Sequence, residues 1–236
     1  MSIALITGAS RGIGRATALR LAADGHTIAA GYGTNRQAAE ALAAELPDAI
    51  AVGGDLRDPA TPARLVDAVE AGLGPVEILI ANAGMGSPPR RLEEIGLAEW
   101  DELHAVNLRA SFLLAQRVLP GMIERGFGRI VFVSSVAAFT GGIIGAHYAS
   151  SKAGLHALAH SISQQAAAHG VTANVVAPAL IESDMLPALS REALAAKLPV
   201  GRLGRAEEVA DLIAAVVANG YLTNQSILLD GGWHPS

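Results

Sequence analysis

A tyrosine and a lysine four positions apart, Tyr148 and Lys152, have the types and spacing for proton-transfer chemistry. Residues at i and i+4 of a helix project from the same face. A nearby cation stabilises a phenolate, so we expect Lys152 to lower the pKa of Tyr148 from its ordinary value of about 10. Tyr148 would then donate and accept a proton. Taken alone, such a pair is more often one buried ring and one solvated charge, so other features must support the interpretation.

A glycine-rich turn near the start of the chain, Gly8–Gly14 (GASRGIG), predicts a phosphate site. An apolar run precedes it and a helical pattern follows it, and the free N–H groups of a helix start bind phosphate well. Its spacing, G-x-x-x-G-x-G, differs from the G-x-G-x-x-G dinucleotide pattern. The turn also matches the G-x-S-x-G elbow of α/β hydrolases. That elbow needs an oxyanion loop from an earlier strand, and only seven residues precede Gly8.

Apolar β-type runs alternate with helical patterns along the chain, which favours a parallel sheet covered on both faces. The expected strands are 2–7, 27–31, 49–53, 76–81, 128–134, 171–177 and 226–229. The expected helices are 12–24, 35–46, 60–72, 97–125, 147–169 and 206–218. We therefore predict an α/β fold, a single doubly wound Rossmann-type domain over residues 1–236 with a seven-stranded parallel sheet.

Composition excludes several classes of function. The 236 residues are 51% apolar, with a mean hydropathy of +0.36, which is typical of a globular chain with a large core. The net charge is −5 and the 17 Lys and Arg residues are scattered, so we expect no nucleic-acid partner. We expect no membrane partner either, and a cytoplasmic protein without disulfides, because there is no 18-residue apolar stretch and no cysteine. His156 and His160 lie four apart but lack a third ligand, so we predict no metal site and a packing or interface role.

Polar and turn residues follow several of the expected strands. Each has a local explanation as a turn residue or a polar helix residue. Because the carboxyl ends of parallel strands meet at one edge, their convergence predicts a ligand site there. These residues are Asp55 and Leu56 after the third strand, Asn82, Ala83 and Gly84 after the fourth, Ser134 and Ser135 after the fifth, and Pro178 after the sixth, with Asn107 inside the long helix.

The combined pattern resembles the short-chain dehydrogenase/reductase family over essentially the whole chain. The family pattern is Thr-Gly-x-x-x-Gly-x-Gly, an Asn-x-Gly turn, a helix Asn, a Ser, and Tyr-x-x-x-Lys thirteen residues after that Ser. The spacing selects Ser135 over Ser134. The glycine turn and the closing segment Leu229–Gly232 most resemble those of 3-oxoacyl-[acyl-carrier-protein] reductases.

The resemblance implies roles for the residues that match. Tyr148 would protonate a carbonyl oxygen, Ser135 would hold that oxygen, and Lys152 would lower the Tyr148 pKa and bind the nicotinamide ribose. Asn107 would hold a water that links Lys152 to solvent. The expected cofactor-binding residues are Gly8, Ser10, Arg11, Gly12, Ile13, Gly14, Tyr32, Arg36, Asp55, Leu56, Asn82, Ala83, Gly84, Tyr148, Lys152, Pro178 and Ile181.

Charge around the second strand favours NADP(H) over NAD(H). An NAD enzyme of this fold commonly has Asp or Glu at the end of that strand, to bind the ribose 2′-hydroxyl. Tyr32 occupies this place, and Arg11 and Arg36 can supply positive charge to a 2′-phosphate. The alternative is that both arginines are ordinary surface residues.

We predict an NADPH-dependent reductase of 3-oxoacyl thioesters linked to acyl carrier protein or coenzyme A. A reductase of free ketones or alcohols and a non-catalytic dinucleotide-binding regulator are the alternatives. An apolar lid is expected between Ala179 and Gly204, formed by Leu180, Ile181, Met185, Leu186 and Leu189.

Two partner surfaces are also expected from the resemblance. Basic residues that dock the carrier protein in the family align with Gly126 and His169, and Arg125 and Arg129 could supply charge instead. A homotetramer is expected, or else a dimer. Its interface would bury the apolar face of the 147–169 helix, formed by Leu155, Leu158 and Ile162.

Overall fold

A seven-stranded sheet runs through the protein, and every pair of neighbouring strands is parallel. The computed structural model describes residues 1–182 and 191–234. The strands are β1 (Ile3–Ile6), β2 (Thr27–Tyr32), β3 (Ala49–Gly53), β4 (Ile78–Ala81), β5 (Gly128–Val133), β6 (Val171–Pro178) and β7 (Ser226–Leu229). Their spatial order is β3-β2-β1-β4-β5-β6-β7. The chain therefore adds strands toward one edge from β1 to β3, and toward the opposite edge from β4 to β7. The predicted doubly wound α/β fold is confirmed.

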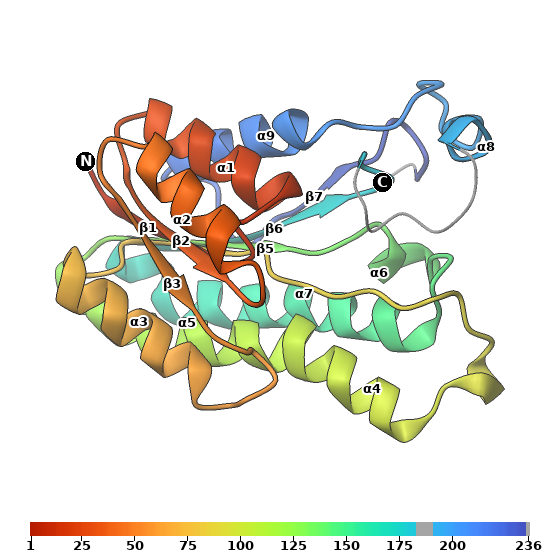
Figure 1. Cartoon of the computed structure of the whole chain (residues 1–236), viewed down its shortest axis with the longest axis horizontal. Coiled ribbons are helices and arrows are strands. Elements are labelled where there is room, and N and C mark those ends of the chain that lie inside the picture. Colours follow the sequence, from red (N-terminus) through yellow and green to blue (C-terminus); the bar gives the residue numbers. More distant parts are fainter. Residues whose placement is uncertain (183–190, 235–236) are drawn as a thin grey trace.

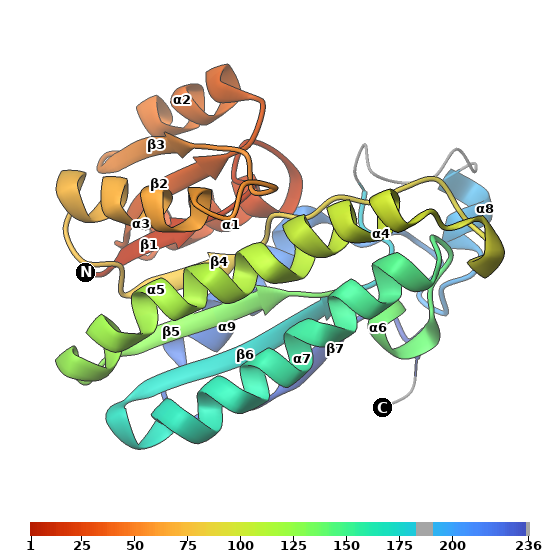
Figure 2. The same cartoon turned by 90° about the horizontal axis from the view of Figure 1, so that it is seen from below.

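Helices cover both faces of this sheet (Figure 1). One layer contains α1 (Gly12–Ala23), α2 (Arg36–Glu45) and α9 (Ala206–Ala218). The other contains α3 (Thr61–Gly72), α5 (Ala110–Arg125) and α7 (Ala146–Ala166), which Figure 2 shows side by side. Strand side chains alternate between the two layers, so Leu5 belongs to one apolar core and Ile6 to the other. Continuous apolar runs therefore form strands here because both faces are buried.

The helical segment predicted over 97–125 has the predicted bounds, and a π-helical turn replaces regular α-helix at its middle. It consists of α4 (Leu97–His104), a π-helical turn (Ala105–Arg109) and α5. Asn107 lies in that turn, fully buried, with its side-chain amide bonded to both the N–H and the carbonyl of Met85. A π turn accommodates one extra residue, and here it directs the Asn107 amide at the loop after β4.

Short elements were missed because they are too brief to carry a periodic pattern. They are the 3₁₀ turn Leu92–Glu94 and the helices α6 (Ala137–Thr140) and α8 (Arg191–Ala195), whereas the 3₁₀ turn Ala167–His169 falls inside the predicted helix 147–169. Both α6 and α8 lie at the end of the sheet where the strands finish, on the right of Figure 1. Across residues 1–182 and 191–234, no helix is long and apolar enough to cross a membrane.

The apolar face of α7 is not available to a second chain. Leu155 is 1% exposed and Ile162 is 5% exposed, and both belong to the protein's own core. Leu158 is partly buried against the same core. These side chains are covered because α7 packs on β6. The prediction that this face forms a subunit interface is therefore wrong.

Candidate active site

The glycine turn and the end of β4 are joined through Thr7. The Thr7 hydroxyl oxygen accepts hydrogen bonds from the backbone N–H of Asn82 at 3.1 Å and of Ala83 at 3.0 Å. The Asn82 side chain in turn donates to the Thr7 carbonyl at 2.9 Å. Gly14 lies so close to Gly8 that a Cβ added there would be 2.2 Å from the Gly8 carbonyl oxygen. The two predicted loops thus meet at the centre of the sheet edge.

The start of α1 faces this meeting point. Its N-cap residue, Arg11, makes no capping hydrogen bond with its own side chain. The first N–H groups of α1 are the donors that a phosphate would use. Of the predicted residues, Gly8 and Ser10 lie in the connection between β1 and α1, and Gly12 and Gly14 lie in the first turn of α1.

Ser135 and Tyr148 are brought together from different elements. Ser135 follows β5, and Tyr148 lies in the first turn of α7. Burial raises the pKa of the Tyr148 phenol, and a hydrogen bond with the Ser135 side chain only partly offsets this. The expectation that Lys152 lowers the Tyr148 pKa is wrong for this arrangement, because desolvation of the ring dominates.

Lys152 is almost completely buried, with 4% of its surface exposed. Its Nζ donates a hydrogen bond to the Val133 carbonyl at 2.9 Å, and burial lowers its pKa to about 8. A Cβ at Gly84 would be 3.0 Å from the same Nζ, so a side chain there would require the ammonium group to shift. Sequence reasoning missed Val133, because a backbone carbonyl carries no signal in the residue type.

Asn107 has the predicted proximity to Lys152 but different contacts. Its Oδ1 accepts from the Met85 N–H at 2.8 Å. Both amide hydrogens are taken, one by the Met85 carbonyl at 3.0 Å and one by the Ser151 hydroxyl at 3.1 Å. The side chain therefore fastens the loop after β4 to α7. Because both amide hydrogens are used, a water at Asn107 would have to donate to one of its oxygens, and the expectation that Asn107 holds a water for Lys152 stays a prediction.

A cavity of about 150 Å³ joins several of the predicted residues. Its lining consists of Ile13, Ser134, Ser135, Val136, Ala137, Gly142, Ile143, Ile144, Tyr148, Pro178, Ala179, Leu180, Ile181 and Trp233. Most of these side chains are apolar. Sequence reasoning missed Trp233, whose signal was its position directly after the predicted Leu229–Gly232 segment.

A larger groove, of about 430 Å³, lies elsewhere, on the outer side of α3 and α5. Its charged lining residue, Arg117, is bound by Asp67 at 2.7 Å and Glu70 at 2.8 Å. No predicted site residue lines it. We therefore place the candidate active site at the smaller cavity.

The predicted lid is only partly described. Leu180 and Ile181 are 9% and 7% exposed. Leu180 packs with Leu194, Leu198 and Leu203 in a small separate core. Met185, Leu186 and Leu189 lie outside the described residues.

The end of β2 carries the residues that were expected to select the cofactor. The Tyr32 ring lies against Gly53, where an added Cβ would be 2.2 Å from ring atom Cζ. Arg36 begins α2, with its side chain 73% exposed and its Nε 2.7 Å from Glu40. Arg11 is exposed at the start of α1. This part of the edge has cations at its surface and no carboxylate at the end of β2.

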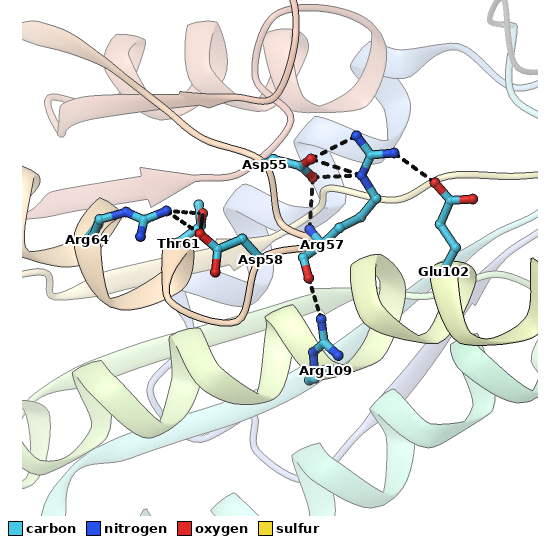
Figure 3. A network of polar contacts seen from close by, with 7 residues as sticks. All are labelled: Asp55, Arg57, Asp58, Thr61, Arg64, Glu102 and Arg109. Carbon is cyan, nitrogen blue, oxygen red and sulfur yellow. Dashed lines mark hydrogen bonds and ion pairs between the residues drawn. The ribbon is translucent and has the colours of Figure 1, made fainter. Parts of the chain in front are cut away.

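Asp55 is held in a network of exposed charges (Figure 3). Arg57 lies 2.7 Å from Asp55 and 2.9 Å from Glu102 of α4, and its hydrogen bonds to Asp55 lower the pKa of that carboxyl. Arg109 of the π turn donates to the Arg57 carbonyl at 2.5 Å. The next predicted residue, Leu56, packs against the core. The loop after β3 is thus fastened to the α4–α5 region.

Comparison with known proteins identifies the family of this chain. Residues 2–193 match the family model of the short chain dehydrogenases, and the chain belongs to this family. The 3-oxoacyl-[acyl-carrier-protein] reductase FabG of Escherichia coli (strain K12) is 36% identical over 242 residues, covering 98% of this chain and 97% of the relative. FabG of Staphylococcus aureus is 33% identical over 240 residues, with the same coverage of 98% and 97%.

A solved structure shares the whole fold. The blue fluorescent protein from a metagenomic library, in complex with NADPH, superposes with a TM-score of 0.92. It is 34% identical in sequence, and the match covers 99% of this chain and 98% of that one. The family and this neighbour support an oxidoreductase that works with a nicotinamide cofactor.

Proposed function

We propose that this protein reduces 3-oxoacyl thioesters, linked to acyl carrier protein or coenzyme A, to 3-hydroxyacyl thioesters with NADPH. The observation that carries the proposal is the cavity in which Tyr148 and Ser135 face Ile13, at the start of α1. This cavity places a proton donor beside the helix start at which a dinucleotide would be held.

The residues present fit NADP(H). The uncapped start of α1 suits the pyrophosphate, and the cations Arg11 and Arg36 suit a 2′-phosphate, with no carboxylate at Tyr32 to repel it. The NADPH complex of the similar blue fluorescent protein supports the same choice. Bound NADPH would supply the hydride for the carbonyl carbon.

The other predicted cofactor-binding residues lie along the same edge. Asn82, Ala83 and Gly84 follow β4, Asp55 and Leu56 follow β3, and Pro178 and Ile181 close the edge at β6. We propose that these residues contact the part of NADP(H) that lies between its adenine and nicotinamide rings.

Tyr148 is the proposed general acid. Its raised pKa keeps the phenol protonated at neutral pH, as a donor in the reductive direction requires. The carbonyl oxygen takes the Tyr148 proton as the carbonyl carbon gains a hydride, so the C=O group becomes C–OH. Ser135, bonded to the Tyr148 side chain, is placed to donate a hydrogen bond to the same oxygen.

Lys152 and Asn107 have supporting roles in the proposal. Lys152, with a pKa of about 8, can release and regain a proton near neutral pH and so restore the proton of Tyr148. We propose that Lys152 also binds the hydroxyl groups of the nicotinamide ribose. Asn107 keeps the loop that ends in Met85 against α7, so Gly84 remains over the ammonium group.

The thioester substrate rests on the FabG relatives and the apolar cavity. At the predicted docking place, both arginines are held by backbone carbonyls. The Arg129 guanidinium donates to the carbonyls of Val217, Gly128 and Gly170, and burial lowers its pKa. Arg125 donates to the Val76 carbonyl. These contacts favour coenzyme A thioesters as the first substrates to test.

Free ketones or alcohols are the second candidate class, because none of the cavity-lining residues within 1–182 and 191–234 is charged and could bind a thioester's carrier. A regulator without activity is less favoured. Such a protein would need neither the Ser135–Tyr148 bond nor the buried Lys152.

A homotetramer is also proposed, with surfaces other than the buried face of α7. Light scattering of the purified chain measures its mass directly. A tetramer has four times the mass of the 24.1 kDa chain, whereas a monomer would refute the assignment.

The decisive assay follows NADPH and NADH oxidation by absorbance. Acetoacetyl-coenzyme A, an acyl-carrier-protein thioester and a panel of free ketones are compared. Faster turnover of thioesters with NADPH than with NADH supports the proposal. Faster turnover of the thioester linked to acyl carrier protein than of acetoacetyl-coenzyme A would support docking of the carrier protein. Turnover of free ketones alone would overturn the thioester substrate. Tight NADPH binding with no turnover of any substrate would favour the regulator.

A further inference from the structure

His156, which lies outside the predicted site, is joined to two serines from different strands. It lies one helical turn after Lys152 on α7. Its Nε2 is 2.9 Å from the Ser134 Oγ at the end of β5, and its Nδ1 is 2.7 Å from the Ser226 Oγ at the start of β7. The Phe139 ring of α6 contacts the imidazole edge-on, with ring centroids 4.9 Å apart. His160, one turn further along, contacts the Asn224 side chain instead.

The direction of these hydrogen bonds follows from counting hydrogens. A serine hydroxyl has one hydrogen, and that of Ser134 is donated to the Lys152 carbonyl at 2.9 Å. Toward His156, the Ser134 oxygen must therefore accept, so Nε2 carries the imidazole hydrogen. Nδ1 of the neutral ring then accepts from Ser226. The direction also excludes Ser134 as a nucleophile activated by His156, because its hydrogen points at a carbonyl.

Ser134 stands between two residues that contact the proposed proton-transfer groups. The carbonyl of the preceding residue, Val133, accepts from the Lys152 ammonium group at 2.9 Å. The following residue, Ser135, is bonded to the Tyr148 side chain. The Ser134 hydroxyl itself binds the Lys152 backbone. The end of β5 is therefore fastened to α7 at three consecutive residues.

We propose that His156 is a positioning residue, which holds Ser134 in the rotamer that fixes Lys152 and Tyr148 against the end of β5. The expected effect on kcat rests on the proposed function, whereas the expected effect on the contact between β5 and α7 does not. The neutral ring that it requires is favoured by the surroundings, since burial and the nearby His160 lower the His156 pKa. Ser226 fixes the ring from the other side.

The test compares variants that keep or lose one contact each. Gln at position 156 places an amide near the Nε2 position and retains a donor for Ser134, whereas Asn reaches only the Nδ1 position. Ser134→Ala removes the intermediate hydroxyl. His160→Asn is the matched control, because it alters a histidine on the same helix that contacts neither serine.

An activity-independent measurement uses the two lysines of the sequence, Lys152 and Lys197. With ε-¹³C-lysine labelling, NMR titration gives a separate pKa for each. In His156→Asn and Ser134→Ala, loosening of the β5–α7 contact admits water and raises the Lys152 pKa toward its ordinary value. His156→Gln and His160→Asn leave it unchanged. An unchanged Lys152 titration in both His156→Asn and Ser134→Ala would overturn the proposal.

The kinetic measurement uses whichever substrate the natural chain reduces. We expect kcat to fall about tenfold in His156→Asn, as loss of a hydrogen bond of about 1.4 kcal/mol would cause. The KM for NADPH stays within about twofold, and the isotope effect with deuterated NADPH rises as chemistry becomes slower. Equal losses in His156→Asn and His156→Gln would contradict positioning through Ser134. If the natural chain reduces nothing, the proposed function fails and the lysine titration alone decides the role of His156.

Discussion

Lys152 and Arg36 are both cations of the candidate site, yet their surroundings are opposite. Lys152 is buried beneath Gly84 and bonded to a backbone carbonyl. Arg36 is largely exposed beside Glu40 on its own helix. The difference extends to their neighbours, because Asn107 is fully buried and Tyr148 is half-buried, whereas Asp55 lies in a network of exposed ion pairs.

This contrast indicates how strongly single residues determine function at the two ends of the site. At the buried end, position and proton affinity are set by desolvation and fixed hydrogen bonds, so single atoms matter. At the exposed end, charges are screened and held by flexible side chains, so any one of them contributes little. Substitutions at the two ends should differ in size accordingly.

The largest effect is expected from Tyr148→Phe, which removes the proposed proton donor from the buried end. We expect kcat to fall by about 10³-fold, within the usual range for loss of a general acid, while NADPH affinity changes by less than about twofold. Steady-state rates and fluorescence titration with NADPH measure the two quantities. Tyr221→Phe is the control, since Tyr221 is 98% exposed. Retained turnover in Tyr148→Phe would refute the mechanism.

Lys152→Met tests the burial of a cation through the pH dependence of stability. The folded pKa is about 8 and the ordinary value is 10.5, so between these pH values the unfolded chain binds more protons than the folded one. Stability therefore rises with pH across this window in the natural chain. Relative to the variant, the gain is about 3 kcal/mol at most. Urea unfolding of both proteins at the two pH values measures it. Parallel pH dependence in the two proteins would show that Lys152 is solvated.

A pair of glycine substitutions compares the two ends directly. Gly84→Ala places a methyl group 3.0 Å from the Lys152 Nζ, so the ammonium group must move, whereas an alanine at Gly33 meets no atom within 4 Å. We expect Gly84→Ala to lower kcat by about tenfold, from a displacement that costs about 1.4 kcal/mol. Gly33→Ala should stay near the natural rate. Similar activities for both variants would remove the distinction between the ends.

The smallest effect is expected at Arg36. Arg36→Ala removes one exposed cation from the proposed 2′-phosphate site, and we expect the preference for NADPH over NADH to fall by about fivefold, as loss of about 1 kcal/mol implies. The ratio of kcat/KM for the two cofactors measures it. Arg91→Ala, which removes an exposed arginine paired with Glu93, should leave the ratio unchanged. A decrease of 100-fold or more in this ratio would show that a single exposed residue matters as much as a residue at the buried end.

The sequence predicted the sheet well because strands buried on both faces are continuous apolar runs, such as Ile130–Val133. The strand ends also predicted that Ser135 and Tyr148 would lie at one edge of the sheet, whereas the choice of Ser135 over Ser134 came from the family pattern. The direction of the Tyr148 pKa could not be predicted. It depends on how much protein covers the ring, which local spacing does not reveal.

Other features depend on contacts between distant segments. The Val133 carbonyl that holds Lys152 is a backbone group, and any residue type would supply it. Trp233 reaches the cavity only because β7 lies beside β6. The π turn was hidden because Asn107 bonds to Met85 of another loop, whereas the residues around it form helices well. These are the points at which tertiary contacts override a local pattern.

The π turn has a consequence for the tolerance of this region to insertions and deletions. One additional residue in a helix rotates everything after it by about 100° relative to everything before it. The buried positions of α5, including Leu114 and Val118, are therefore in phase with the core only because Ala105–Arg109 contains that residue. Deleting one residue elsewhere in α5 would turn its later apolar side chains toward solvent. Deletion of one residue within the π turn would instead convert it to a regular helix and rotate the whole of α5. The turn that holds Asn107 therefore determines which side chains of α5 face the core.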